Sequence, residues 1–235
     1  MTVLIRYTVA ALTLLCLIST THAGTGIKVG ATVSQWNYVK KDSILPNIAN
    51  GTNFAIVGIQ EFALSKTFSI QIEPTYSVRS FDMSIDKLVM QQLGQYTQPL
   101  PSSLPSTLSY TQKFASLDCP VLLKVNLTES GIRPYIFAGP NVSVNLSATA
   151  TANFDTTNMQ LQKPLDVTPE AKGAVINVDM GAGVQIPLAL SIALVADARY
   201  TFGLGDVSSF KAFGTAIGTA KTGDIRVFAG IVLDL

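Results

Sequence analysis

The feature that most constrains this chain is an alternation of apolar and polar residues with a period of two. Between residues 68 and 79 one set of alternate positions is apolar or aromatic: Phe68, Ile70, Ile72, Pro74, Tyr76 and Val78. The positions between them are polar: Ser69, Gln71, Glu73, Thr75, Ser77 and Arg79. Successive side chains of a strand point to opposite faces. The segment therefore predicts a strand with one apolar face and one polar face.

The same pattern recurs along the chain and predicts eight strands, at about 26–38, 53–64, 67–82, 108–127, 132–147, 174–186, 189–203 and 224–235. Many exceed the roughly 9–11 residues with which a tilted strand crosses a bilayer. Short turns are expected at 64–67, 128–131 and 186–189, and long polar loops at 39–52, 83–107, 148–173 and 204–223. This alternation of short and long connections is typical of outer-membrane barrels. The prediction is an all-β, eight-stranded antiparallel up-and-down transmembrane β-barrel.

The first 23 residues predict a cleaved signal peptide, which leaves one domain at 24–235. Arg6 supplies a positive charge, an apolar stretch runs over 7–20, and the small Ala23 suits cleavage. The stretch is shorter than the ~20 residues needed to span a membrane as a helix. We expect an integral protein of the bacterial outer membrane, with both ends of the mature chain in the periplasm.

Composition excludes several function classes. The only histidine, His22, lies in the signal peptide, so the mature chain has no imidazole for a catalytic triad or a typical zinc site. Beyond Arg6 the basic and acidic side chains are equal in number, and no basic patch points to nucleic acid. The single Cys119 of the mature chain has no intramolecular partner for a disulfide. We therefore expect neither an enzyme nor a cofactor.

Charged residues gather on the polar faces of the predicted strands. They are Lys28, Arg79, Lys124, Arg133, Arg199 and Arg226, against Glu73, Asp118, Asp179, Asp197 and Asp234. In a membrane barrel the polar face points inward, and eight strands leave an interior that side chains fill. We predict a lumen network in which Glu73, Asp118, Asp179 and Asp197 pair with Arg79, Lys124, Arg133, Arg199 and Arg226. Glu61 and Lys113 are expected on the opposite faces, near strand ends.

Two further expectations concern individual residues. Pro120, Pro134 and Pro140 lie inside predicted strands, and bulges are expected there because proline avoids paired positions. Tyr76, Tyr200 and Phe202 fall on lipid faces toward the long-loop end, as an aromatic belt requires.

Specific segments resemble a known family. The sequences "LDCPVLLKVNL" and "IRPYIFAGPNVSVNLSA", within 117–148, resemble paired strands of the PorT-like outer-membrane β-barrel family. The segment 178–207, "VDMGAGVQIPLALSIALVADARYTFGLGDV", resembles a hairpin of that family, and 26–36 resembles its opening strand more loosely. The resemblance implies an eight-stranded barrel in the outer membrane of Bacteroidota-like or Chlorobi-like bacteria. It implies no single activity.

Three functions fit these observations. The first is a non-enzymatic barrel with a filled polar lumen and a structural or partner-contacting role through the four long loops. Its expected partners are outer-membrane lipids, the barrel-assembly machinery during biogenesis, and a protein or envelope component at the loops. The second is a small-solute transport or ligand-binding barrel, with a cavity at the inward glycines: Gly30, Gly139, Gly181 and Gly183. The third is a soluble lipocalin-like secreted barrel, in which the charged faces are a solvated surface.

Overall fold

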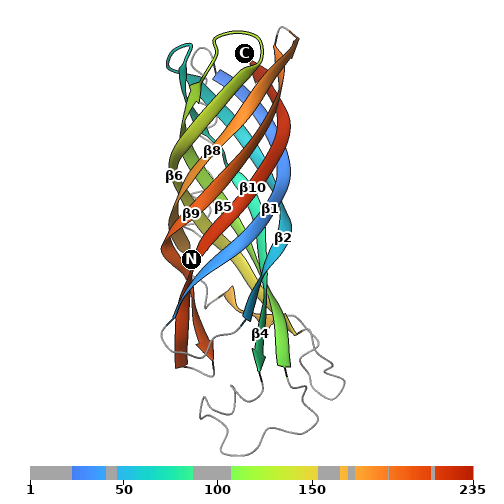
Figure 1. Ribbon diagram of the computed structural model, residues 1–235, viewed down its shortest axis with the longest axis vertical. Helices are drawn as coiled ribbons and strands as arrows, with labels where there is room; N and C mark the ends of the chain where they lie inside the picture. The colour runs from blue at the N-terminus through green and yellow to red at the C-terminus, as the bar shows by residue number, and fades with distance from the viewer. Residues whose placement is uncertain are drawn as a thin grey trace, which may run out of the picture.

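The computed structural model describes residues 23–40, 47–86, 107–152, 165–168, 173–189, 191–212 and 215–234. These residues form one tall antiparallel sheet that closes on itself (Figure 1). Its strands are β1 (Ala23–Lys40), β2 (Asn47–Ala63), β3 (Phe68–Ile72), β4 (Thr75–Asp86), β5 (Thr107–Asn126), β6 (Arg133–Ala152), β7 (Leu165–Asp166), β8 (Ala174–Ala189), β9 (Ile192–Ala212) and β10 (Thr215–Asp234).

Eight of these strands, with β3 and β4 taken together, form the wall. Against β5, Ile72 pairs with Val121 and Thr75 pairs with Asp118, so β3 and β4 share one register across a short interruption at Glu73. The two-residue β7 pairs only with β6 and lies outside the ring. Pairing of β1 with both β2 and β10 closes the barrel. The predicted eight-stranded antiparallel fold is confirmed.

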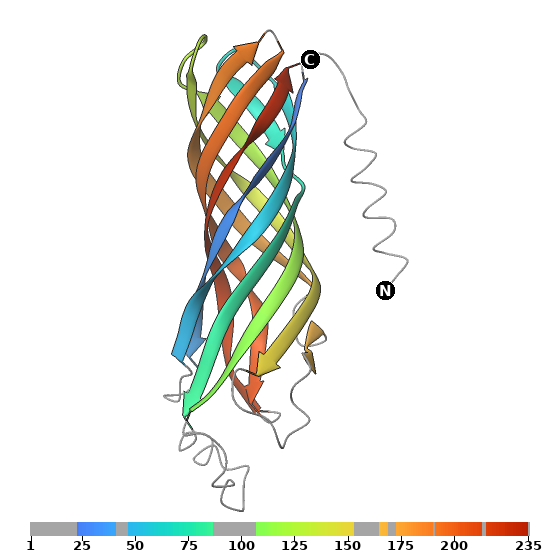
Figure 2. The same ribbon diagram turned by 90° about the vertical axis from the view of Figure 1, so that its right-hand side faces the viewer.

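The short turns, the start of β1 and the end of β10 all lie at the same end of the molecule (Figure 2). Gly24 at the start of β1 pairs with Asp234 at the end of β10. The predicted turns at 64–67 and 128–131 are present between strands. Gly131 there has φ of 70°, a left-handed conformation that glycine adopts without steric cost. The opposite end is called the long-loop end below.

All four predicted long loops are wrong in part, because strands run into them, most of all at 204–223 and 39–52. The strand β8 also runs through the expected turn at 186–189. Most of 204–223 is strand: β9 continues to Ala212, which pairs with Thr215 of β10. Residues 47–52 likewise belong to β2. Register shifts lie between Ala216 and Gly218, between Ala220 and Lys221, and between Lys221 and Gly223. Another lies between Asn50 and Ala55. Each bulge breaks the period-two pattern, and the sequence therefore lacks the alternation that predicts a strand there.

The expected bulges at the prolines are also wrong. Along β6 the register with β8 is continuous through Pro134 and Pro140, and the register of β5 with β6 is the same on both sides of Pro120. Proline loses only its donor, and its carbonyl still pairs. The amide of Glu73 donates to the carbonyl of Pro120 at 3.1 Å, and that of Gly58 donates to the carbonyl of Pro74 at 2.9 Å.

The two faces of the wall are reversed relative to a soluble protein. On β1, Ile27 and Val29 are 50% and 57% exposed, whereas Lys28 between them is 2% exposed. On β10, Arg226 is buried between the exposed Ile225 and Val227. Charged groups therefore fill the inside and aliphatic groups coat the outside, the arrangement of a barrel surrounded by lipid. The soluble lipocalin-like alternative, which needs the apolar face inside, is wrong.

The described part of the chain contains no helix long and apolar enough to cross a bilayer.

Candidate functional site: a charged and closed lumen

Four lumen side chains form a closed cycle of ion pairs, here called the Lys28 ring. Lys28 Nζ lies 2.7 Å from Glu73 Oε1 and 2.6 Å from Asp197 Oδ2. Arg199 completes the cycle, with Nη1 2.7 Å from Glu73 Oε2 and Nη2 2.8 Å from Asp197 Oδ1. Two cations thus alternate with two carboxylates, and the ring carries no net charge.

A second cycle, the Arg79 ring, lies further toward the long-loop end of the strands. Arg79 reaches Asp118 Oδ2 at 2.9 Å and Asp224 Oδ2 at 2.6 Å. Arg226 contacts the same two carboxylates at 2.9 and 3.0 Å. Ser77 donates a further hydrogen bond to Asp118 at 3.0 Å. This ring is also neutral.

Aromatic rings pack against the Lys28 ring and shield it from water. The guanidinium carbon of Arg199 lies 4.8 Å from the centroid of the Phe137 ring and 4.9 Å from that of Phe228. Lys28 Nζ lies 5.8 Å from Phe228. Burial of an ion carries a large desolvation cost, which well-placed partners offset. The alternating rings and the flanking aromatic faces supply those partners.

A third group of charges lies at the short-turn end. Lys124 Nζ contacts Glu61 at 2.9 Å and Gln185 at 3.1 Å, and lies 4.5 Å from the centroid of the Tyr135 ring. Glu61 also accepts hydrogen bonds from Ser69 and Gln71 at 2.6 and 2.9 Å. Beyond this group an open cavity of about 630 Å³ faces the short turns, and Glu61, Lys66, Glu129 and Arg133 are among its lining residues.

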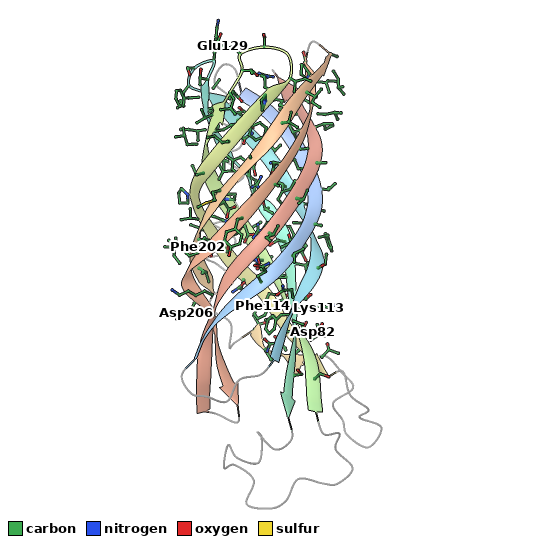
Figure 3. The ribbon with its side chains drawn as sticks, in the orientation of Figure 1. Asp82, Lys113, Phe114, Glu129, Phe202 and Asp206 are labelled. Carbon is green, nitrogen blue, oxygen red and sulfur yellow. The ribbon has the colours of Figure 1, made fainter. Side chains whose placement is uncertain are left out.

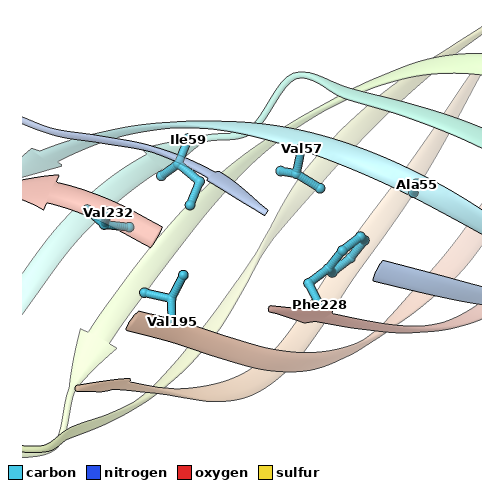
Figure 4. Packing of buried hydrophobic residues seen from close by; sticks show 6 residues of the cluster. All are labelled: Ala55, Val57, Ile59, Val195, Phe228 and Val232. Atoms are coloured by element: carbon cyan, nitrogen blue, oxygen red, sulfur yellow. The ribbon is translucent and has the colours of Figure 1, made fainter. Parts of the chain in front are cut away.

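Apolar side chains fill the space between the charged groups. Figure 4 shows a lumen cluster from β2, β9 and β10: Ala55, Val57, Ile59, Val195, Phe228 and Val232. Three of the inward glycines make room for aromatic rings and leave no cavity. A Cβ on Gly30 would lie 2.6 Å from Phe228 Cδ1, one on Gly181 2.6 Å from Phe137 Cζ, and one on Gly183 2.5 Å from Tyr135.

Buried aromatic rings also occupy the lumen toward the long-loop end. Phe81 and Phe114 are both buried and stack with ring centroids 5.9 Å apart. Figure 3 places Phe114 at this end, opposite Glu129 at the short-turn end. Nearby, Ala148 is buried, and its carbonyl accepts a hydrogen bond from the amide of Val167 at 3.0 Å. The segment after β7 is thereby held against the rim of the barrel.

The structure brings most of the predicted lumen residues together, but the partners differ. Lys28, Glu73, Arg79, Asp118, Asp197, Arg199 and Arg226 make up the two rings together with Asp224. Lys124 pairs with Glu61, which was expected on the lipid face. Asp179 is bound by Asn141, not by a cation. Arg133 lines the short-turn cavity. The side chain of Asp234 lies outside the described residues.

Sequence reasoning missed Glu61 and Asp224. Asp224 lies two residues before Arg226 and therefore on the same face of the strand, which is a usable signal. It directly follows a register shift at Gly223, which hides the alternation before it. Glu61 gave no such signal, since the other lumen positions of β2 are the apolar Ala55, Val57 and Ile59. Lys113 is exposed toward the long-loop end, on the face that was expected (Figure 3), but β5 extends six residues beyond it to Thr107.

Within the described ranges, no group of three or more His, Cys, Asp or Glu side chains has the geometry to hold a metal ion. The buried polar groups are instead ion pairs and hydrogen bonds that cross the lumen. Such an arrangement stabilises a closed barrel.

Comparison with protein families now identifies the chain. The model of the family described as "Outer membrane protein beta-barrel domain" matches residues 21–209. The protein belongs to this family. It is accordingly an integral β-barrel protein of the bacterial outer membrane. The match is to this broad family, and it does not separate the PorT-like branch from others. Comparison with curated proteins returns no match.

Solved barrels share the fold of this outer-membrane protein at low sequence identity. The outer membrane protein OprG from Pseudomonas aeruginosa is 11% identical, with a TM-score of 0.50, and 91% of this chain and 96% of that one are covered. Neisserial surface protein A is also 11% identical, with a TM-score of 0.47 and coverage of 90% and 97%. The likeness to OprG concerns the fold alone.

Proposed function

We propose that the protein is a non-enzymatic outer-membrane barrel whose lumen is a structural core and whose long-loop end contacts an envelope partner. The observation that carries the proposal is the filling of the lumen by two neutral ion rings, an apolar cluster beside the Lys28 ring, and the stacked Phe81–Phe114 pair. A body closed in this way acts through its surface. The likeness of 117–148 and 178–207 to PorT-like barrels supports placement in that branch.

The proposal includes an orientation and a maturation step. Removal of 1–23 as a signal peptide places the start of β1 and the end of β10 in the periplasm, together with the short turns. The segments at the other end then face the outside. Outer-membrane lipids surround the wall, and the barrel-assembly machinery inserts it.

Exchanging residues 88–105 for a short Gly-Ser linker tests the surface role. The exchange leaves β4 and β5 intact, so we expect a barrel that still migrates faster unboiled than boiled on a gel. A strain that carries only this variant should lose envelope integrity, measured as growth in the presence of detergent.

A matched change at the opposite end, Lys66→Gln with Glu129→Gln, should leave growth unchanged, because that pair is exposed at 3.7 Å. Full complementation by the linker variant would contradict the surface role of this loop.

A further inference from the structure

Asp179 on β8 is a lumen carboxylate that is fully buried and has no cationic partner among the described residues. Its two oxygens accept hydrogen bonds from the Asn141 amide, at 3.2 and 3.1 Å. Each buried cation forms ion pairs with other carboxylates, and Arg226 has one further N–H, at Nε, without a hydrogen-bond partner. Lys28 and Arg199 bind Glu73 and Asp197, Arg79 and Arg226 bind Asp118 and Asp224, and Lys124 binds Glu61.

Unpartnered oxygens surround this carboxylate. Thr201 on β9 is paired directly with Asp179 across one strand boundary and with Asp224 on β10 across the other. The Thr201 hydroxyl, Asp224 Oδ1 and Asn141 Oδ1 are all buried without a hydrogen-bond partner in the described structure. Three oxygens that need a partner therefore adjoin a carboxylate that needs a counter-charge.

Both needs have one solution. A buried, unpaired charge costs several kcal/mol, and unsatisfied buried polar groups point to an ion or a water. Hard cations bind carboxylate, hydroxyl and amide oxygens. We propose that Asp179, Thr201, Asn141 and Asp224 form a lumen site for one hard monovalent cation, of which Na⁺ is the test case.

The charge balance and the ligand type select this class of ion. Both ion rings are neutral, so one positive charge compensates Asp179, whereas a divalent ion would leave an excess. The donor set holds no imidazole or thiolate, the ligands that transition metals prefer. A proton on Asp179 would also remove the charge, but its single O–H could serve one of the three oxygens and would leave the other two without a partner.

The test compares the purified barrel in detergent, exchanged into choline chloride, with the same protein in NaCl at equal ionic strength. Binding to the folded state alone raises the unfolding midpoint by about 3–6 °C at a Na⁺ concentration of about ten times Kd. The ²³Na resonance should broaden when the protein is added. Asp179→Asn should abolish both effects, while Asp82→Asn, at an exposed carboxylate of β4, should leave them intact.

A second variant covers the case in which Asp179→Asn does not fold. Thr201→Val keeps the shape and the charge but removes one oxygen, and should weaken Na⁺ binding about 10-fold or more. Equal midpoints in choline and sodium with no broadening would overturn the proposal. So would stabilisation by acid alone, since that result assigns a proton to Asp179.

Discussion

Glu73→Gln is expected to lower the free energy of unfolding by about 3–5 kcal/mol, the cost of leaving buried charges uncompensated. Glu73 is fully buried and neutralises Lys28 and Arg199 at 2.7 Å each. Its loss leaves two cations facing the single carboxylate of Asp197. The free energy of unfolding is measured by equilibrium urea titration in lipid vesicles, in which the folded fraction is read from the electrophoretic mobility.

The four side chains of the Lys28 ring depend on one another, so a double variant provides a second test of this prediction. Adding Lys28→Met to Glu73→Gln restores charge balance, so the double variant should lose less than the sum of the single losses by about 1 kcal/mol or more. Glu129→Gln is the control, because its exposed pair with Lys66 should contribute less than about 1 kcal/mol. Equal, small losses for Glu73→Gln and Glu129→Gln would show that the ring does not stabilise the barrel.

Gly181→Val is expected to prevent most of the protein from folding. A Cβ at this position would lie 2.6 Å from Phe137 Cζ and 2.9 Å from the Arg199 Cα atom. Phe137 cannot move away freely, because its ring packs against the Arg199 guanidinium of the Lys28 ring. Overpacking of this kind costs about 1–3 kcal/mol or more, and here part of the clash is with the backbone. The fraction that migrates as a compact unboiled band after refolding measures the effect.

Gly173→Val provides the comparison for Gly181→Val. A Cβ at Gly173 meets no atom within 4 Å, so the folded fraction should match that of the natural sequence. Normal folding of Gly181→Val would mean that the lumen holds free space next to Phe137, in favour of the transport alternative.

The alternation of side chains along a strand predicts which face a residue occupies, provided that one face of the strand is uniformly polar. Lys28 between Ile27 and Val29, and Arg226 between Ile225 and Val227, are the clearest cases. The alternation gives no such prediction on β2, because both faces of that strand are apolar. Its lumen positions Val57 and Ile59 pack against Phe228 and Val232. Glu61 was misplaced for that reason.

The sequence does not predict which lumen charges form ion pairs with one another. Lys28 and Asp197 are 169 positions apart, and Arg79 and Asp224 are 145 apart. They meet only because the barrel closes and its strands are staggered across the lumen. The sequence predicts a loop at 204–212 because glycines and the bulges near Lys221 and Gly223 hide the alternation of the β9–β10 hairpin.

Current through planar lipid bilayers tests the central claim, a closed lumen, most directly. Purified protein that has folded, as judged by its faster unboiled migration, should add no steady unit conductance above that of the bare membrane in concentrated KCl. The ion rings, the apolar cluster and the Phe81–Phe114 pair block the path. A reproducible unit conductance that scales with salt concentration would contradict the account and establish the protein as a channel.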